Sequence, residues 1–317
     1  MSLFDGIASC RVALERADIY VDTYYASEID KDAIKVATTN YPNIIELGDI
    51  RYIDGNKYAN AIDLLTFGSP CTNFSCSGKK QGMVTKEKIK LDCLDTYMDC
   101  KLKGIEFEGQ SYLFWEAIRL LNEIKPTYFL MENVKMKDEW VSIITEALGV
   151  KPIELNSSLV SAQNRIRLYW TNIPQVTKLT DKHIVLKDIL EDIKYINPAA
   201  LRGRQLNIDQ YPKGTKIPYT QCLEVKSKDT DKSNCLTTVA KDNVLTSLSA
   251  GRYEDAISNN LPYRYYTVKE YERLQNLTDG YTSCISESKA KKVIGNGWTI
   301  DIITHLMEGL SYGMEGC

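Results

Sequence analysis

The chain has 317 residues, about the length of two domains, with 44% hydrophobic and 26% charged residues. This composition is typical of a globular protein and excludes a disordered or fibrous chain. No run reaches the roughly 18 apolar residues that cross a membrane, and the chain does not open on a basic and then apolar leader. We therefore expect a cytoplasmic protein that does not bind membranes.

Short apolar runs alternate with stretches of helical periodicity up to about residue 173. This alternation predicts an α/β fold with a doubly wound, mostly parallel sheet that has helices on both faces. Ligands of such sheets bind outside the carboxyl ends of the strands. The predicted strands are Met1–Phe4, Asp22–Ser27, Ile62–Phe67, Tyr128–Glu132, Ile153–Leu155 and Arg165–Thr171, and the predicted helices are Cys10–Ala17, Asp32–Asn40, Ser111–Ile124 and Glu139–Leu148.

The stretch Met83–Gln110 interrupts this pattern, because it is charged and only partly helical. We interpret it as an insertion or a mobile loop.

The pattern changes after Pro174, where Pro, Lys, Gly and Asn become frequent. A helix is predicted over Val185–Ile193, and short strands over Gln221–Val225 and Cys235–Ala240. We therefore predict three parts: a catalytic and cofactor-binding domain over 1–173, a smaller strand-and-loop domain over 174–262, and a segment over 263–317 that returns to the first domain.

Two helices are predicted in that last segment. Thr267 and Glu270 form a T-x-x-E capping box at the start of the first. The second follows Trp298, with one apolar stripe of Ile302, Leu306 and Leu310.

The charge is unevenly distributed. The whole chain is −3, but residues 194–241 hold nine Lys and Arg against four Asp and Glu, whereas residues 1–162 hold 18 against 24. A basic region on an acidic body can bind a polyanion, because the electric field depends on the distribution of charge. A solvated loop region is the alternative.

The nine cysteines include no C-x-x-C pair, and the two histidines are His183 and His305. This predicts reduced thiols and argues against a disulfide framework, a metal site or a Ser-His-Asp triad. We expect no metal.

The first turn suggests a cofactor. Leu3–Ala8 is a strand-to-helix turn with Gly6 as its one glycine, too few for the dinucleotide fingerprint. Glu28 ends the second strand, where a carboxylate can accept ribose hydroxyls, and Asp49 is placed to meet an adenine amino group. Together they fit an adenosine-containing cofactor without a pyrophosphate, such as S-adenosylmethionine; singly, each fits a solvated carboxylate.

Three further motifs could carry chemistry. Gly68–Cys71 places a thiol on a rigid Pro-Cys turn after an apolar strand, although a free cysteine is often a small buried hydrophobe. Glu132 would lie at the same sheet edge, as a ligand of a heteroaromatic ring or as a solvated carboxylate. Gln163, Arg165 and Arg167 would share one face of a strand, suited to a phosphate or a base oxygen, or to a salt-bridge ladder.

In order, the motifs resemble those of the DNA cytosine-5 methyltransferases, and they span the chain from residue 3 to about 310. The compact size resembles the bacterial or phage type, and the first and last motifs resemble the animal de novo branch. The motifs are Leu3–Ile7, Gly68–Cys71 with Phe74 and Ser75, Glu132–Val134, Gln163-x-Arg165-x-Arg167, Arg273–Gln275 with Asp279–Tyr281, and Ile294–Gly297.

The resemblance implies a Rossmann-like S-adenosylmethionine-dependent fold, a target recognition domain over 174–262, and a reaction in which a cytosine is flipped out of duplex DNA. Cys71 would add to carbon 6, Glu132 would hydrogen-bond the ring, and Arg165 would hold the base oxygen or a phosphate. The implied cofactor-binding residues are Phe4, Gly6, Ile7, Glu28, Asp49, Ile50, Pro70, Asn296 and Trp298. The implied DNA-binding residues are Ser75, Gln163, Arg167, Arg202, Arg204 and Gln221.

The resemblance also implies a monomer, either paired with a restriction endonuclease on a separate chain or solitary. Two departures from the family pattern are Ala8 and Ser9, where glycines are usual, and the long Met83–Gln110 stretch. The alternatives are a tRNA cytosine methyltransferase, a catalytically silent DNA-binding homologue and an unrelated doubly wound oxidoreductase.

Overall fold

The computed structural model describes residues 1–70, 82–174, 178–206, 208–212, 214–226 and 231–314. The chain forms two units. The first comprises Met1–Asn156, Ile166–Lys178 and Ile300–Cys317, and the second comprises Ser157–Arg165 and Leu179–Thr299. This division differs from the predicted one, because residues 263–299 belong to the second unit and the return to the first begins at Ile300.

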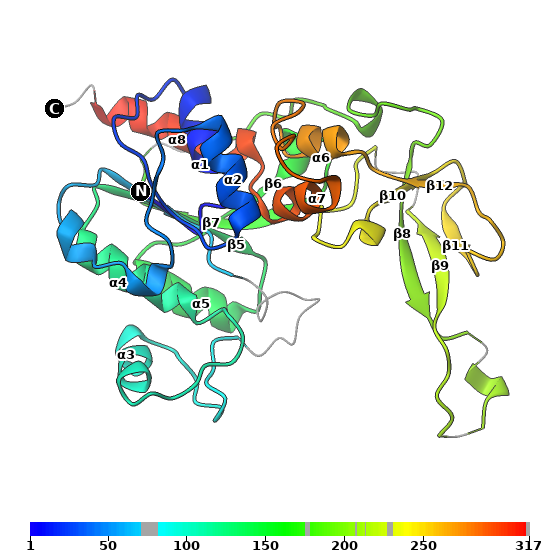
Figure 1. Cartoon of the computed structure of the whole chain (residues 1–317), viewed down its shortest axis with the longest axis horizontal. Helices are drawn as coiled ribbons and strands as arrows, with labels where there is room; N and C mark the ends of the chain where they lie inside the picture. Colours follow the sequence, from blue (N-terminus) through cyan, green and yellow to red (C-terminus); the bar gives the residue numbers. More distant parts are fainter. Residues whose placement is uncertain (71–81, 175–177, 207, 213, 227–230, 315–317) are drawn as a thin grey trace. The chain divides into compact units, whose positions relative to one another are not determined.

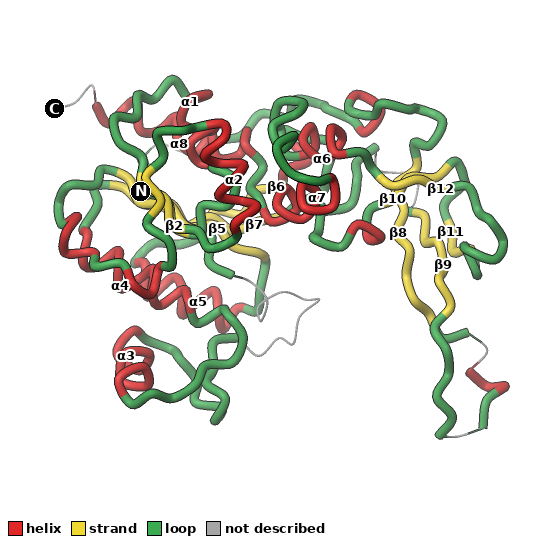
Figure 2. Tube along the Cα trace, in the orientation of Figure 1, coloured by secondary structure: helices red, strands yellow, loops and turns green. Residues whose placement is uncertain are grey.

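A seven-stranded sheet forms the centre of the first unit (Figures 1 and 2). Its order is β3-β2-β1-β4-β5-β7-β6, in which β3 to β5 are parallel and β7 runs antiparallel to both of its neighbours. The six predicted strands are confirmed with small shifts at their ends, and β3 was not predicted. The strands are β1 (Ser2–Leu3), β2 (Tyr25–Ser27), β3 (Ile45–Glu46), β4 (Leu64–Phe67), β5 (Tyr128–Val134), β6 (Ile153–Asn156) and β7 (Ile166–Thr171).

Helices cover both faces of this sheet, as predicted. Figure 1 shows α1, α2 and α8 on one side of it and α4 and α5 on the other. In α8, Ile302, Leu306 and Leu310 are buried as one stripe, which confirms the predicted amphipathic pattern. The helices are α1 (Ser9–Arg16), α2 (Lys31–Asn40), α4 (Leu113–Ile124), α5 (Asp138–Leu148) and α8 (Ile300–Met314).

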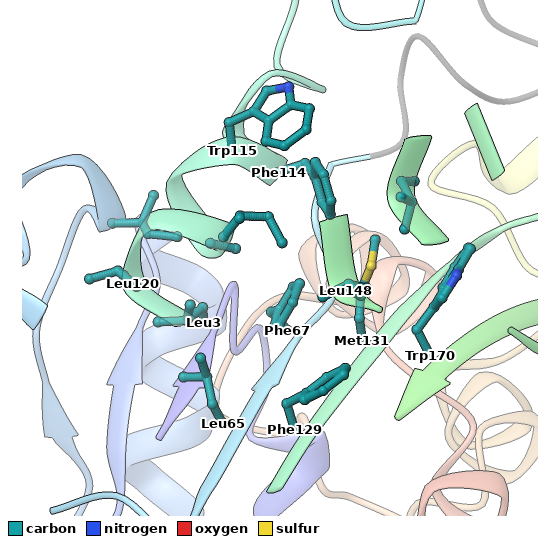
Figure 3. Packing of buried hydrophobic residues seen from close by; sticks show 14 of the residues in the cluster. Leu3, Leu65, Phe67, Phe114, Trp115, Leu120, Phe129, Met131, Leu148 and Trp170 are labelled. Carbon is teal, nitrogen blue, oxygen red and sulfur yellow. The ribbon is translucent and has the colours of Figure 1, made fainter. Parts of the chain in front are cut away.

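A large apolar core lies between the sheet and α4 and α5 (Figure 3). Leu3, Phe67 and Met131, from three neighbouring strands, are fully buried against Phe114 and Leu120 of α4. Fully burying one such side chain contributes about 1.5–3 kcal/mol. This packing fixes the strands, and therefore the positions at which they end.

The Met83–Gln110 stretch is folded onto this core, so its interpretation as a mobile loop is wrong. It contains α3 (Leu94–Leu102), and both Leu91 and Tyr97 are buried in the core cluster. The indole Nε1 of Trp115 donates a hydrogen bond of 3.2 Å to the carbonyl of Leu91. The sequence of this stretch is dominated by charged residues, but a few buried apolar residues attach it to the core, and the charge pattern does not reveal them.

The second unit contains a five-stranded antiparallel sheet in the order β11-β9-β8-β10-β12. One face of this sheet packs on an apolar cluster that includes Leu201, Leu223 and Val244. The capping box of Thr267 and Glu270 is confirmed at the start of α6. The elements are β8 (Asn197–Arg204), β9 (Thr220–Val225), β10 (Val244–Thr246), β11 (Gly251–Tyr253), β12 (Tyr263–Tyr265), α6 (Val268–Leu274) and α7 (Glu287–Asn296).

Two predicted elements of this unit are wrong. Val185–Ile193 forms only the 3-10 turn Leu186–Asp188, because the N–H of Glu191, which a helix would direct to the carbonyl of Lys187, donates instead to the carboxylate of Glu270.

The strand predicted over Cys235–Ala240 is the second wrong element, because this segment forms no strand. Its backbone N–H groups donate to side chains instead: that of Leu236 donates to Oε1 of Gln163, and that of Val239 donates to the hydroxyl of Thr237.

No helix in the described part of the chain has the length and apolar character to span a bilayer.

The turn between β1 and α1 has an unusual backbone. Phe4, Gly6 and Ala8 adopt φ values of 55°, 62° and 62°. Two of these residues carry a Cβ in the left-handed region, which costs roughly 1–2 kcal/mol each. Such strain concentrates at functional sites, and this turn ends on the N-terminus of α1.

We predict that Ala8→Gly relieves this strain. The substitution removes one buried methyl group, so its matched control is Ala13→Gly, which removes a buried methyl group from the interior of α1. We expect Ala13→Gly to lower the free energy of unfolding by about 1–2 kcal/mol, and Ala8→Gly to leave it unchanged or raise it by up to about 1 kcal/mol. Urea denaturation measures both, and equal losses would contradict the prediction.

Candidate active site

The carboxylate of Glu28 is fixed at the end of β2. It accepts hydrogen bonds from the backbone N–H groups of Gly6 at 2.9 Å, Ile29 at 2.6 Å and Asp30 at 2.8 Å. The structure therefore brings together Gly6 and Glu28, which the sequence predicted to share a cofactor site. Phe4 is half-buried against the core and Ile7 is buried.

Two further carboxyl groups lie close to Glu28 and were missed from the sequence. Burial raises the pKa of Asp5 to about 6, although the hydroxyl of Tyr24 donates to it at 2.6 Å. Burial, and then the charges of Asp5 and Glu28, raise the pKa of Glu46 to about 7. Both carboxylate oxygens of Glu46 are buried without a hydrogen-bond partner in the described structure. Asp5 precedes the glycine of the first turn, but Glu46 ends the strand that sequence reasoning missed.

Asp49 lies at the next turn along this edge. It caps the 3-10 turn Ile50–Tyr52, and Arg51 donates to its carboxylate from Nε at 3.0 Å and from Nη2 at 2.5 Å. These bonds hold the pKa of Asp49 below its usual range. Ile50 is buried directly after it.

The loop after β4 is tied to β5. The side-chain amide of Asn133 donates to the carbonyl of Ser69 at 3.3 Å and to its hydroxyl at 3.1 Å. Pro70 follows and is half-buried. Cys71 and Ser75 lie outside the described residues. Asn133 of the Glu-Asn-Val motif therefore contacts the residue that directly precedes Pro70.

Glu132 is buried and forms an ion pair with Arg167, with 2.9 Å between Oε1 and Nε. The two residues lie on adjacent antiparallel strands, β5 and β7. Arg167, predicted to bind DNA, therefore also compensates the charge of the predicted catalytic carboxylate.

Gln163 and Arg165 do not share a strand face with Arg167, and that expectation is wrong because β7 begins at Ile166. Arg165 belongs to the second unit, where it is buried and donates to the carbonyls of Leu236 at 3.2 Å and Gly297 at 2.9 Å.

Gln163 is fully buried, and its amide donates to the carbonyl of Leu274 and, at 2.9 Å, to the side chain of Gln275. In this structure the side chain of Gln163 therefore contacts other residues of the second unit.

These bonds join three of the predicted motifs in the second unit. Gln275 contacts Gln163 and donates to the carbonyls of Ile294 and Gly297, both at 3.1 Å. Gly295 lies so close to a neighbouring loop that a Cβ on it would be 2.6 Å from the carbonyl oxygen of Thr237. The glycine of this motif is required by close packing.

The two remaining cofactor candidates also belong to this unit, where Asn296 is exposed and Trp298 is half-buried.

Three predicted DNA-binding residues lie on the antiparallel sheet. Arg202 pairs with Asp242 at 2.6 Å, and Arg204 pairs with Glu224 at 2.7 Å. Gln221 is opposite Gly203 in the register, so it faces the other side of the sheet from the two arginines. Arg252 adds a third guanidinium to the arginine side, 3.2 Å from Glu224.

Among the described residues, no three His, Cys, Asp or Glu side chains gather as a metal site.

Comparisons with known proteins agree with these motifs. A family model described as C-5 cytosine-specific DNA methylase matches residues 1–139. The type II methyltransferase M1.ScrFI of Lactococcus lactis subsp. cremoris is 26% identical over 99% of this chain and 78% of its own length. The orphan methyltransferase M.Rho11sI of Bacillus phage rho11s is 30% identical over 67% of this chain, which spans 39% of that relative.

Solved structures share the fold. The DNMT2 of Spodoptera frugiperda has a TM-score of 0.62 and 18% identity, covering 98% of both chains. The methyltransferase EhMeth of Entamoeba histolytica has a TM-score of 0.65 and 16% identity, covering 99% of this chain and 97% of its own. The chain therefore belongs to the C-5 cytosine-specific DNA methylases, which transfer a methyl group to carbon 5 of cytosine in DNA.

Proposed function

We propose that this enzyme uses S-adenosylmethionine and acts through Cys71, Glu132 and Arg165 on a cytosine flipped out of duplex DNA. The observation that supports this proposal is the pair of hydrogen bonds from Asn133 to Ser69, because Asn133 directly follows Glu132 and Ser69 directly precedes Pro70. We further propose that the protein acts as a monomer.

The carboxylates at the edge of β1 to β3 fit the proposed cofactor. Asp5, Glu28 and Glu46 make this edge strongly acidic, which disfavours the phosphates of a dinucleotide and favours a nucleoside that carries positive charge. Glu28 would accept ribose hydroxyls, and Asp49 and Ile50 would meet the adenine. S-adenosylmethionine, when bound, supplies the methyl group as a cationic sulfonium.

The proposed catalytic residues make the unreactive carbon 5 of cytosine nucleophilic. Carbon 5 of cytosine is a weak nucleophile inside the base stack, and flipping the base out costs a few kcal/mol. The Cys71 thiolate adds to carbon 6, and the ring electrons then make carbon 5 nucleophilic. Glu132 hydrogen-bonds ring nitrogen 3 and the exocyclic amine, while Arg165 binds the base oxygen or an adjacent phosphate. After transfer, carbon 5 loses its proton and Cys71 is expelled, which leaves 5-methylcytosine.

The relatives leave the biological setting open between two roles. The Lactococcus relative is a type II methyltransferase and the phage relative is an orphan methyltransferase. A partner endonuclease on a separate chain and a solitary role both fit this chain.

Bisulfite sequencing tests the proposed reaction. Unmethylated plasmid incubated with the protein and S-adenosylmethionine is expected to show protected cytosines in one short context. Cys71→Ala should abolish protection and retain cofactor binding, because the thiol serves chemistry and not the cofactor.

Protection at the wild-type level by Cys71→Ala would overturn the assignment. If the wild type binds the cofactor and protects no cytosine, a methylation assay on RNA separates an RNA substrate from a silent homologue.

The acidic edge predicts a pH dependence of cofactor binding. Deprotonation of Asp5 and Glu46, with pKa values of about 6 and about 7, adds negative charge that favours a cation. The affinity for S-adenosylmethionine is therefore expected to rise roughly tenfold between about pH 5.5 and pH 8. S-adenosylhomocysteine lacks the sulfonium charge and should show a smaller rise.

Calorimetry measures both ligands, with Glu46→Gln as the control that flattens the profile. Identical profiles for the two ligands would refute a role for these charges.

The arginine side of the antiparallel sheet is proposed to bind DNA phosphates. The double variant Arg202→Gln and Arg204→Gln is expected to weaken DNA binding and to lower the slope of log affinity against log salt by about 2. Arg16→Gln in the first unit, where Arg16 pairs with Asp301, removes one positive charge as a control. An unchanged salt slope in the double variant would place the DNA elsewhere.

A further inference from the structure

A buried group of charges lies on α4, outside the residues assigned above. The Glu116 side chain is fully buried and accepts hydrogen bonds from the hydroxyl of Tyr97, from Nζ of Lys101 and, at 2.8 Å, from Nε of Arg119. Tyr97 and Lys101 lie on α3, in the inserted stretch. A buried carboxylate without such donors would be strongly unfavourable, so this arrangement holds Glu116 ionised and keeps its pKa below the usual value.

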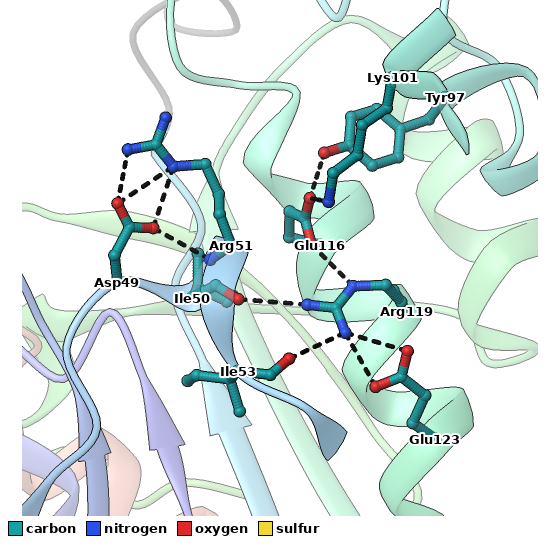
Figure 4. Close-up of polar contacts among 9 residues, drawn as sticks. All are labelled: Asp49, Ile50, Arg51, Ile53, Tyr97, Lys101, Glu116, Arg119 and Glu123. Atoms are coloured by element: carbon teal, nitrogen blue, oxygen red, sulfur yellow. Dashed lines mark hydrogen bonds and ion pairs between the residues drawn. The ribbon is translucent and has the colours of Figure 1, made fainter. Parts of the chain in front are cut away.

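Arg119 extends from this group to the proposed cofactor turn (Figure 4). Its Nη2 donates to the carbonyl of Ile50 at 3.2 Å, and its Nη1 donates to the carbonyl of Ile53 at 3.1 Å. These carbonyls lie at the start and just past the end of the 3-10 turn that Asp49 caps. Arg119 thus connects both ends of this turn to a helix of the core.

A second acidic residue orients the guanidinium from the other side. Glu123 accepts from Nη1 of Arg119 at 3.0 and 2.8 Å, and it also accepts from the backbone N–H of Gly55 at 2.9 Å. Glu116 and Glu123 therefore fix the plane of Arg119. A lysine could not reproduce this geometry, because its single ammonium group lacks the planar fork that reaches both carboxylates and both carbonyls.

We propose that Arg119 is a positioning residue for the cofactor, which acts by fixing the backbone of the Asp49–Ile53 turn. The proposal rests on the proposed function, in which Asp49 and Ile50 meet the adenine. It also gives the inserted stretch a role, since Tyr97 and Lys101 complete the donors of Glu116, which orients Arg119. A cluster that only stabilised the fold would not affect cofactor affinity selectively.

The test compares cofactor binding with stability in the full chain. For Arg119→Lys, we expect S-adenosylhomocysteine to bind roughly tenfold more weakly by calorimetry, and KM for S-adenosylmethionine to rise by a similar factor. The value of kcat at saturating cofactor and the Kd for DNA without cofactor should stay within about twofold of the wild type.

Ile118→Val is the control for general destabilisation, and Glu116→Gln is a second test of the proposal. Ile118→Val alters the core on the same helix and should lower Tm without changing S-adenosylhomocysteine affinity. Glu116→Gln keeps the shape of the side chain and weakens its hydrogen bond with Arg119, so we expect S-adenosylhomocysteine to bind about threefold more weakly. This variant still tests the proposal if Arg119→Lys fails to fold.

The outcomes separate this inference from the proposed function. If the wild type binds S-adenosylhomocysteine and a folded Arg119→Lys or Glu116→Gln binds it equally well, the positioning role is wrong and the proposed function stands. The positioning role is also wrong if Ile118→Val loses affinity as well and the losses in all three variants are proportional to their falls in Tm. If the wild type binds neither S-adenosylhomocysteine nor S-adenosylmethionine, the proposed function itself fails.

Discussion

The parallel register of β1, β2, β3 and β4 is the constraint on which the candidate site depends. Parallel strands end at one edge of a sheet, so segments that are 20 or more residues apart in sequence come together there. The hydrogen bond from the N–H of Gly6 to the carboxylate of Glu28 forms because the register brings the ends of β1 and β2 side by side. The core packing against α4 and α5 fixes the strands, and a shift of one strand would move the carboxylate it carries away from the turn.

Charge at this edge is arranged by local means. Asp5 and Glu46 are held in surroundings that raise their pKa values, whereas Asp49 is neutralised by its neighbour Arg51. The edge thus combines a compensated carboxylate with uncompensated ones. The proposed site must bind a cation and accept hydrogen bonds from hydroxyl groups, and this combination suits both tasks. If every carboxylate were paired with a cation of the protein, the edge would not attract a positively charged ligand. If no carboxylate were paired, several buried negative charges would repel one another.

Most of the fold could be predicted from periodicity, and long-range hydrogen bonds explain part of what could not. The long strands and helices were confirmed because their patterns extend over four or more residues. Val185–Ile193 has a helical pattern, but the backbone N–H of Glu191 donates to the distant carboxylate of Glu270. The burial of Gln163 was missed for the same reason, since the hydrogen-bond partners of its side chain lie more than 70 residues away. Sequence pattern reports local preference, and long-range hydrogen bonds can override it.

The same distinction explains why the candidate site was only partly visible in the sequence. Glu28 follows β2 directly and Glu132 lies near the carboxyl end of β5, so their place at a sheet edge could be inferred from the pattern alone. Arg119 lies in the middle of a helix, where an arginine is usually a solvated surface residue, and its contacts with Ile50 and Ile53 cross 66 or more positions. Its burial beside Glu116 and Glu123 makes sense only once α4 is packed beside the turn. Residues that hold the site in place are therefore harder to find than residues that form it, because their function depends on the packed fold rather than on a motif.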